Sequence, residues 1–510
     1  MPVSNISARN ALGHLLRAFS GIDLPIRPFC AVAPVLGLMA MMMSTSHLAP
    51  LLISWIYDDG MIAIFAFSMA FNFAVGYVAW LTTRRHQAEL EPRDGFLLVS
   101  LAWMGGAAFA TIPLLGGIGG LSFTDAYFET ASGLTTTGAT VLSNLDTMPE
   151  SMNFWRHLLN WLGGMGIIVL AVAILPLLGV GGMQVYKAET PGPMKDAKLT
   201  PRIRETAKNL WVIYAVLTAA CAISLNISGM SWFDAICHAF SALSLGGFST
   251  HDASVGFFDS VAIEAVLIVF MMLAAINFAT HFLSWRGKSP HAYLRDSEAT
   301  AVWTVLVVSS LGVAAYLYYA GTYSSFWISL RHATFNLVSI ATDCGYASVD
   351  FDKWPAFAPV SMLLLSCMVC SSGSTGGGIK MIRTLILMRQ VGREMRLLPH
   401  PHAVNPLKIG GAVVENKVVF AVLGFIVIYS GSVTMLTFAL MASGLDAISS
   451  LSAVIACINN MGPGLNQVGP ATNFASLSDY QTWVLTFAMV LGRLELFTLL
   501  ILLSPGFWRR

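Results

Sequence analysis

The sequence predicts an all-α protein that crosses a membrane many times and forms one pore from four repeated units. Two observations carry this prediction. Hydrophobic residues make up 56% of the 510 residues and charged residues only 11%, whereas about 25% charge is usual in soluble domains. Four short polar stretches, each built around a glycine, interrupt the hydrophobic helices at intervals of roughly one hundred residues, which indicates a repeated structural unit.

About ten apolar segments approach or exceed the ~20 residues that cross the hydrocarbon core of a bilayer. The expected spans are 29–48, 61–82, 96–116, 155–180, 208–229, 259–284, 300–320, 357–390 (interrupted), 416–441 and 481–506. The chain accordingly divides into an N-terminal region with two extra transmembrane helices and four pore repeats. Their boundaries are 1–94 for the N-terminal region and 95–200, 201–298, 299–408 and 409–510 for the repeats.

The basic residues predict the orientation of the chain. Counted on alternate sides of the expected spans, 24 of the 28 Lys and Arg residues fall on one side, together with both termini. Because basic residues concentrate on the cytoplasmic face of membrane proteins, we expect the N- and C-termini in the cytoplasm. The first 25 residues lack the pattern of a cleavable signal, and we expect no cleavage there. The exceptions to the charge rule are Arg156, Arg331, Lys353 and Arg493.

Acidic residues collect on the opposite, outer face. Fourteen of the 27 Asp and Glu residues lie in outward-facing segments, among them Glu129 and Asp343. With few basic residues beside them, they predict a negative potential that concentrates cations at an outer mouth. A merely solvated loop face is the alternative.

The four polar stretches are the expected walls of the pore. Each follows a helix too short to span a bilayer and lies in an outward-facing connection. Irregular backbone at membrane depth is tolerated only where it is buried in protein or lines water. The alternative is that their glycines only end helices or let helices pack closely. The stretches are 132–140, 241–250, 339–348 and 457–464, with the candidate glycines Gly138, Gly247, Gly345 and Gly462.

Matching registers support the repeat. Three residues lie 13 positions before their glycines (Asp125, Asp234 and His332), and three serines lie six positions before them (Ser132, Ser241 and Ser339). An Asp near a helix N-terminus complements the helix dipole. The fourth unit is expected to be a looser copy, because Asp446 lies 16 residues before its glycine and Ala456 replaces the serine.

The chemistry of these loops suits a cation. A short helix that descends into the membrane aims its negative C-terminal end at the centre, and backbone carbonyls of the following loop can replace the hydration shell of an ion. Glycine permits a positive φ and keeps no side chain between the four backbones. The residues themselves indicate a pore for a monovalent cation without naming the ion. The carbonyls expected to face it belong to Thr136, Thr137 and Gly138; Leu245, Gly246 and Gly247; Asp343, Cys344 and Gly345; and Asn460, Met461 and Gly462.

The eighth span is interrupted by the sequence CSSGSTGGGIK at 370–380. Such a flexible polar stretch should not persist in a helix that faces lipid. We interpret it as a mobile loop across the inner pore, that is, a gate; a plain kink is the alternative. Its residues are Ser371, Ser372, Gly373, Ser374, Thr375, Gly376, Gly377 and Gly378, with Lys380 at the inner edge.

Arg493 lies in the middle of the last expected span. An arginine there costs at least ~2.5–3.5 kcal/mol on insertion scales, so it should face the interior of the bundle. A fixed positive charge below a cation site would shorten the dwell time of the ion. The alternative is a structural pair with Glu495 or with helix carbonyls.

Two other classes of protein compete with a gated pore. An alternating-access cation symporter, coupled to protons or sodium, also uses broken helices near the midplane, but its halves usually have inverted topology. An intramembrane enzyme would use Ser374 or a cysteine as nucleophile, and no base stands out near Ser374 except Lys380. Cys367 and Cys370 form an isolated C-x-x-C without a second pair, which is weak support for a metal or redox site. We expect neither an enzyme nor a nucleic-acid partner.

These motifs together resemble the bacterial Trk/Ktr/HKT potassium-transport superfamily, in particular its TrkH branch. The resemblance covers about residues 95–510, and the two extra N-terminal spans are also typical of that branch. It rests on the four glycine stretches, NWLGGMGIIVLAVAILPLLGVGG (160–182), GSTGGGIKMIR (373–383) and LGRLELFTLL (491–500).

The resemblance implies more than the residues alone. It implies four helix–pore-helix–helix units around one pseudo-fourfold pore, a homodimer in the bacterial inner membrane, and potassium as the bound ion. It also implies a TrkA-like cytoplasmic regulatory protein, which senses nucleotide and sets gating, with the basic inner loops 181–208 and 380–417 as its contact. The filter glycines of the superfamily match the four glycines above, its gating loop matches 371–378, and its pore arginine matches Arg493. Glycine in all four loops goes with potassium selectivity, and serine in the first goes with sodium preference.

Overall fold

The computed structural model describes residues 26–84, 91–169, 203–403 and 405–508. Within them the chain is predominantly helical, with one two-stranded antiparallel ribbon, β1 (Lys408–Ile409) and β2 (Ala412–Val413). Three expectations fall wholly or largely outside the described residues: the N-terminal 25 residues, the inner end of the span 155–180, and most of the basic loop 181–208.

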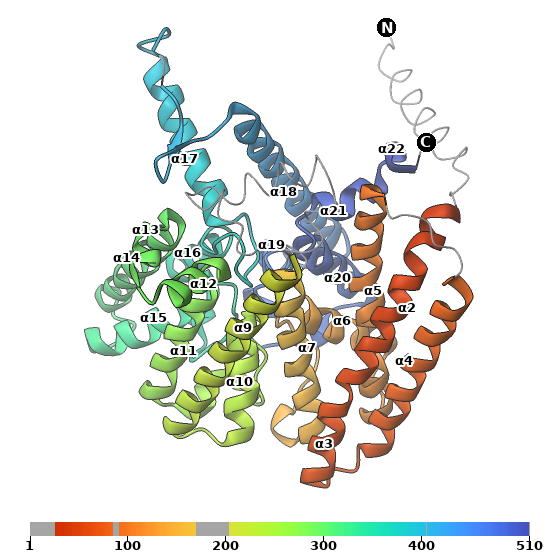
Figure 1. Ribbon diagram of the computed structural model, residues 1–510. Helices are drawn as coiled ribbons and strands as arrows, with labels where there is room; N and C mark the ends of the chain where they lie inside the picture. The colour runs from red at the N-terminus through yellow and green to blue at the C-terminus, as the bar shows by residue number, and fades with distance from the viewer. Residues whose placement is uncertain (1–25, 85–90, 170–202, 404, 509–510) are drawn as a thin grey trace, which may run out of the picture.

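Three helices precede the repeated units and lie along one flank of the molecule (Figure 1): α2 (Ile26–Ser46), α3 (Leu48–Tyr57) and α4 (Ile62–Thr83). α2 and α4 pack closely through Gly37 and Gly76. A Cβ added at either glycine would lie 2.7 Å from the carbonyl oxygen of the other. Small residues at such crossings let helix backbones approach in a membrane.

Four segments follow, and each contains a long helix, a short helix and a second helix or helix pair (Figure 1). The first holds α5 (Pro92–Gly117), α6 (Phe123–Leu134) and α7 (Glu150–Val169). The second holds α9 (Ile203–Ile227), α10 (Trp232–Ser244), α11 (Val261–Ala274), α12 (Phe278–Gly287) and α13 (His291–Arg295). The third holds α14 (Ser297–Tyr319), α15 (Phe326–Ala341), α16 (Phe357–Ser366) and α17 (Met381–Leu397). The fourth holds α18 (Asn416–Ala442), α19 (Ala447–Ile458), α20 (Asp479–Arg493), α21 (Phe497–Leu500) and α22 (Pro505–Trp508).

Short 3-10 turns lie in the connections of these segments. They are η1 (Leu145–Thr147), η4 (Ser254–Phe258), η5 (Phe351–Lys353), η6 (Asn466–Val468), η7 (Phe474–Ser476) and η8 (Ile501–Leu503).

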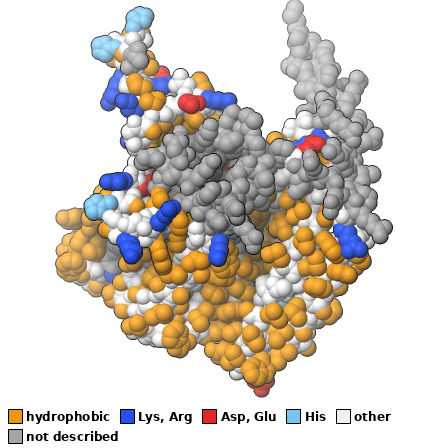
Figure 2. All heavy atoms as spheres, viewed as in Figure 1, with side chains coloured by type: hydrophobic (Ala, Val, Ile, Leu, Met, Phe, Trp, Pro, Cys, Tyr) orange, Lys and Arg blue, Asp and Glu red, His pale blue; other side chains and the backbone are white. Residues whose placement is uncertain are grey.

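Among the described residues, six helices are long and apolar enough to cross a membrane, or eight if two sharply bent pairs each count as one span. Large apolar side chains are exposed on these helices, for example Phe420 and Val427 at 71%. Figure 2 shows a broad hydrophobic belt, with the visible Lys and Arg side chains on one side of it. A surface of this kind fits lipid rather than water, and the protein is a multi-pass membrane protein.

Two of the expected continuous spans are in fact bent. The helices α11 and α12, within the expected span 259–284, meet at 96°, and α20 and the helical turns Phe497–Leu503, within 481–506, meet at 111°. The first bend follows from a tertiary contact, because the free carbonyl of Ala275 accepts the amide of Ser371 at 2.9 Å. At the second bend Glu495 and Leu496 have positive φ values of 55° and 54°. Neither bend has a proline or glycine at its corner, so the sequence alone predicted straight helices.

Three of the four short helices, α6, α10 and α19, have a side-chain cap at the N-terminus, whereas α15 has none. Ser122 and Ser231 cap α6 and α10 by accepting the amides of Asp125 and Asp234 at 3.0 and 3.1 Å. Asp446 caps α19 by accepting the amide of Ser449 at 3.0 Å. All three caps lie 16 residues before their glycines, so the description of the fourth unit as a looser copy is wrong at this position. The sequence analysis matched Asp446 with Asp125 and Asp234, which lie in the first turns of their helices. In the structure Asp446 is the N-cap residue itself.

Candidate functional site

The four glycine loops, far apart in the sequence, meet in one ring. A Cβ added at Gly138 would lie 2.3 Å from the carbonyl oxygen of Gly246, and one at Gly247 would lie 2.0 Å from that of Cys344. A Cβ at Gly345 would lie 2.2 Å from the Met461 oxygen, and one at Gly462 would lie 2.9 Å from the Thr137 oxygen. Each glycine thus faces the carbonyl that precedes the glycine of the next unit, and the fourth unit returns to the first. We call these residues the glycine ring.

The backbone of the ring has the same conformation in all four units. The four glycines have φ values of +79°, +64°, +88° and +96° in chain order. The residue two positions earlier is also left-handed in each case, with φ between 53° and 64°: Thr136, Leu245, Asp343 and Asn460. L-residues adopt this region at a cost of roughly 1–2 kcal/mol. The same conformation in all four loops gives their backbones the same orientation at the ring.

The side chains of the loop residues are buried in the surrounding protein. Leu245, Cys344 and Met461 are fully buried. The amide of Asn460 donates to the Met489 carbonyl at 3.0 Å and to Thr137 Oγ1 at 2.9 Å. The twelve residues expected at the pore are therefore brought together around the glycine ring.

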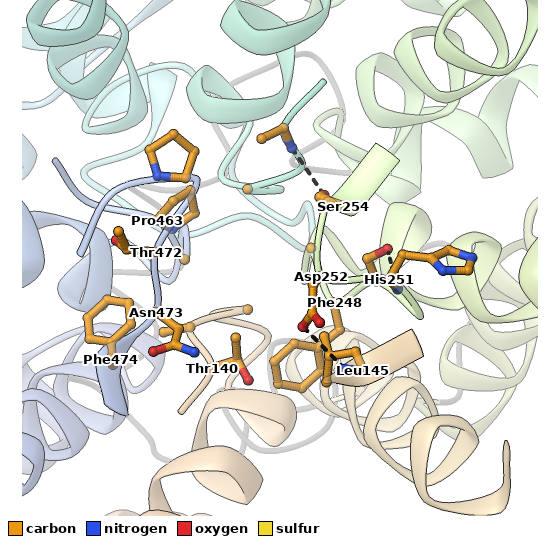
Figure 3. A pocket seen from close by; sticks show the side chains of 18 of the residues that line it. Thr140, Leu145, Phe248, His251, Asp252, Ser254, Pro463, Thr472, Asn473 and Phe474 are labelled. Carbon is orange, nitrogen blue, oxygen red and sulfur yellow. Dashed lines mark hydrogen bonds between the residues drawn. The ribbon is translucent and has the colours of Figure 1, made fainter. Parts of the chain in front are cut away.

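A cavity, which we call the outer cavity, opens at one side of the ring (Figure 3), and all four ring glycines line it. Its wall also includes the labelled residues Thr140, His251, Asp252 and Asn473, which come from loops of the first, second and fourth units. Asp252 Oδ1 accepts the amide of Leu145 at 3.2 Å and so joins two of these loops.

Two acids assigned to the outer mouth from the sequence lie elsewhere. Glu129 is 1% exposed and forms an ion pair with Arg156 at 2.8 Å. Asp343 is fully buried on the inner side of its loop, where Oδ2 accepts the amide of Gly377 at 3.0 Å. Their assignment to a solvated funnel is wrong, because each carboxylate serves a buried partner that is remote in the sequence.

The interrupted helix between α16 and α17 forms a folded loop, residues 367–380, which we call the intramembrane loop. Its first half enters the bend of the second unit: Ser371 N–H donates to Ala275, and Phe278 N–H donates to Gly373 at 3.1 Å. The hydroxyl of Ser374 donates to the Ser371 carbonyl at 2.6 Å, and Lys380 Nζ donates to the Gly376 carbonyl. The loop is thus an ordered structure that several neighbours hold.

The tip of the intramembrane loop lies against the C-terminal ends of three short helices. Thr375 Oγ1 donates to the Leu243 carbonyl at 3.1 Å, at the end of α10. Cys370 Sγ donates to the Thr342 carbonyl at 3.2 Å, at the end of α15. A Cβ added at Gly377 would lie 1.9 Å from the Asn459 carbonyl oxygen, at the end of α19. The loop therefore lies against the helix ends that lead into the glycine ring.

Arg493 ends α20 and holds the tip of the same loop. It is 1% exposed and donates to the carbonyls of Thr375 and Gly163, each at 2.9 Å. Of the two structural alternatives, bonding to helix carbonyls is confirmed, because Gly163 lies in α7. Glu495 forms an ion pair with Arg383 at 3.0 Å. Arg493 is thus a charged contact between the intramembrane loop and the first unit.

Glu298 is a residue of the site that the sequence reasoning missed. It lies in the first turn of α14, it is 6% exposed, and Oε1 accepts the amides of Ser372 at 2.7 Å and Ile382 at 3.2 Å. One carboxylate thus joins the first half of the intramembrane loop to the start of α17, which follows the loop. Its only sequence signal was an acid at the start of an apolar span.

These features define a class: an all-helical, multi-pass membrane protein in which four loops converge on a ring of backbone, with an interrupted helix next to it. The chain belongs to the TrkH family, described as cation transport proteins, whose family model matches residues 62–509.

Individual relatives are similar over almost the whole chain. The Trk system potassium uptake protein TrkH of Vibrio parahaemolyticus is 46% identical over 484 residues, which cover 94% of this chain and 99% of that protein. The protein of the same name from Escherichia coli K12 is 43% identical over 486 residues, with the same coverage. The crystal structure of the potassium transporter TrkH from V. parahaemolyticus is similar with a TM-score of 0.87 and 44% identity, covering 94% of this chain and 100% of that one.

Proposed function

We propose that the protein takes up potassium ions across the bacterial inner membrane through a pore in which the glycine ring selects the ion. The observation that carries the proposal is the ring itself, in which each glycine meets the carbonyl before the next glycine. Backbone carbonyls fixed at close quarters can replace the hydration shell of potassium. The names of the relatives, potassium uptake proteins, support the choice of ion.

The intramembrane loop is the gate in this proposal. It lies inward of the ring, and Arg493, Glu298 and Asp343 hold it by hydrogen bonds. Opening requires that these contacts exchange for others, and the glycines of the loop provide the backbone freedom. The positive charge of Arg493 below the ring would also shorten the dwell time of a cation there.

A cytoplasmic nucleotide-binding regulator of the TrkA type sets the gate, and two copies of the chain form a homodimer. The protein itself binds no nucleotide in this proposal. The basic side chains of α17 support a cytoplasmic docking surface: Arg389, Arg393 and Arg396 lie on the helix that directly follows the gate. Both termini lie in the cytoplasm, as the positive-inside rule requires.

The test is cation flux from the purified protein in liposomes, with potassium and sodium gradients measured in parallel and no partner added. We expect potassium flux well above sodium flux, running to the Nernst potential without a pH gradient. Flux that requires a proton or sodium gradient would contradict a passive pore and would indicate a coupled symporter. Equal fluxes of the two ions would contradict a potassium-selective ring.

A further inference from the structure

The residue nine positions before each ring glycine lies on the short helix of its unit, and in three units it is polar: Glu129, His238 and Asn336. All three are buried and contact the loop that follows their own helix. The fourth unit has Ala453 at this position, and the adjacent Ser452 takes over the contact.

These side chains hold the outer half of each loop. The amide three residues after the glycine donates to Glu129 Oε2 at 3.1 Å in the first unit, to Asn336 Oδ1 at 3.1 Å in the third and to Ser452 Oγ at 2.9 Å in the fourth. In the second unit His238 Nε2 lies 3.0 Å from Ser249 Oγ. The short helix thus holds the same backbone amide in three units and a neighbouring loop side chain in the second, which indicates that the position of this segment matters.

The first unit alone uses a charge for this purpose. Glu129 Oε1 lies 2.8 Å from Arg156 Nε, and both side chains are 1% exposed. The hydroxyl of Thr140, two residues after the ring glycine, donates to the same carboxylate at 3.0 Å and accepts a bond from Arg156 Nη2 at 3.3 Å. The carboxylate, the guanidinium and the loop hydroxyl thus form one closed network.

Arg156 extends this network to the second loop. Its Nη1 donates to the Ser249 carbonyl at 3.4 Å, and the guanidinium carbon lies 4.3 Å from the ring centre of Phe248. Phe248 and Ser249 directly follow Gly247, so one side chain contacts the loops of two neighbouring units. Arg156 also lines the outer cavity, which places a fixed positive charge, compensated by Glu129, beside the path of the ion.

We propose that Glu129 and Arg156 are positioning residues for ion selectivity, which hold the first ring loop and join it to the second. The inference rests on the proposed function of the ring. Coordination by carbonyls discriminates between ions through the number and spacing of the oxygens, so a shift of one loop weakens discrimination. A buried ion pair adds little net stability compared with apolar residues, and loop geometry is what this pair supplies.

The test is the ratio of potassium to sodium permeability of Glu129→Gln, taken from reversal potentials in liposomes. This variant keeps the shape of the side chain but leaves Arg156 without its counter-charge. We expect the ratio to fall roughly tenfold. The free-energy cost of leaving one charge of a buried pair without its partner is larger than the free-energy change that such a shift represents. The isosteric Thr140→Val, which removes only the loop hydroxyl, should lower the ratio less and in the same direction.

The matched control is Arg331→Gln, because Arg331 also pairs with carboxylates, Glu264 and Asp259, but bonds to no ring loop among the described residues. Its permeability ratio should remain that of the wild type. Thr140→Val decides the question if Glu129→Gln does not yield folded, monodisperse protein. An unchanged ratio in a folded variant, beside a selective wild type, overturns this inference alone. A wild type without potassium preference overturns the proposed function and this inference with it.

Discussion

At the scale of single residues, the backbone of the glycine ring leaves no room for a side chain. Gly138 combines a φ of +79° with a neighbouring carbonyl oxygen 2.3 Å from the position of a Cβ. Contacts below 3.0 Å cannot persist, and the obstacle here is backbone rather than a flexible side chain. The ring therefore tolerates a larger residue only if one loop moves away from its neighbour.

Gly138→Ser should lower the preference for potassium over sodium. The new Cβ displaces Gly246 or its own loop, and the left-handed conformation adds roughly 1–2 kcal/mol of strain. We expect the permeability ratio to fall about tenfold or more, because the spacing of the carbonyls changes. Reversal potentials in mixed gradients measure it.

Gly105→Ser on α5 is the control, since nothing lies within 4 Å of a Cβ there. It should retain the ratio of the wild type. Unchanged selectivity in folded Gly138→Ser protein would remove Gly138 from the ion path.

Arg493→Ala should raise basal potassium flux. The substitution removes two bonds from a charged donor to the carbonyls of Thr375 and Gly163. Bonds to a charged group contribute roughly 1.5–3 kcal/mol each, so a rise of about tenfold is expected even if only part of this energy favours the closed loop. Tracer uptake into liposomes without a regulator measures it.

Arg493→Lys separates the two roles of this side chain. Lysine keeps the charge but lacks the planar fork that reaches both carbonyls. A raised flux in this variant would indicate that the bonds matter, and a flux like that of the wild type would indicate the charge. Wild-type flux in both variants would mean that Arg493 has a structural role only.

At the scale of elements, the described helices are broken where the intramembrane loop meets them. The bend between α11 and α12 receives Ser371 and Gly373, and α20 ends at the arginine that holds Thr375. Broken helices near the membrane centre expose backbone groups that must find partners. Here the loop and the helix ends satisfy one another, so a movement of the loop must change several elements together.

Glu298→Gln should weaken the closed position of the intramembrane loop. The carboxylate holds the amides of Ser372, in the loop, and Ile382, at the start of α17, and a neutral amide accepts such bonds less strongly. A loss of about 1 kcal/mol would raise basal flux roughly fivefold. Single-channel or tracer flux at fixed voltage measures the change.

The control for Glu298→Gln is the same substitution at the exposed Glu415, just before α18. Its flux should equal that of the wild type. Equal flux in Glu298→Gln and the wild type would show that the carboxylate does not hold the gate.

At the scale of the whole molecule, carboxylates in the connections between helices tie distant segments together. Asp59, between α3 and α4, accepts the amide of Ser151 at 2.9 Å at the start of α7. Asp146 contacts His251 Nδ1 at 2.5 Å and so joins the first and second units. Partial burial alone would raise the pKa of each carboxyl, but these hydrogen bonds outweigh it and hold the pKa of Asp59 and Asp146 below its ordinary value.

Thermal stability should therefore be lost in acid. A carboxyl with a lowered pKa in the folded state contributes stability that is fully present above its unfolded pKa, about 3.9 for Asp. That stability is lost as the pH falls through the lower, folded pKa. The Tm in detergent should be nearly constant from about pH 7 to about pH 5 and should decline below about pH 4.

Asp59→Asn should lower the Tm at pH 7 and reduce the acid-dependent decline, whereas Asp58→Asn, at an exposed neighbour, should leave the profile unchanged. A decline in Asp59→Asn that is as steep as in the wild type would mean that other groups cause the acid sensitivity.

Local pattern was enough to predict the helical membrane class, most of the spans and the four glycines that meet in the ring. These features depend on the hydrophobicity of contiguous residues and on a repeated register, which the sequence displays directly. The role of the twelve loop residues as a potassium filter, and of 371–378 with Lys380 as a gate, stays a prediction that the flux experiments test.

The tertiary structure alone decided where the helices bend and which partners the buried charges have. Arg493 bonds to the particular carbonyls of Thr375 and Gly163, Glu129 pairs with Arg156 instead of facing an outer mouth, and Glu298 holds amides more than 70 residues away. The physical reason is the same in each case. A buried charge or an open helix end must be satisfied by whichever group the packed units bring within about 3 Å, and that group is determined by how the units pack rather than by its distance along the chain.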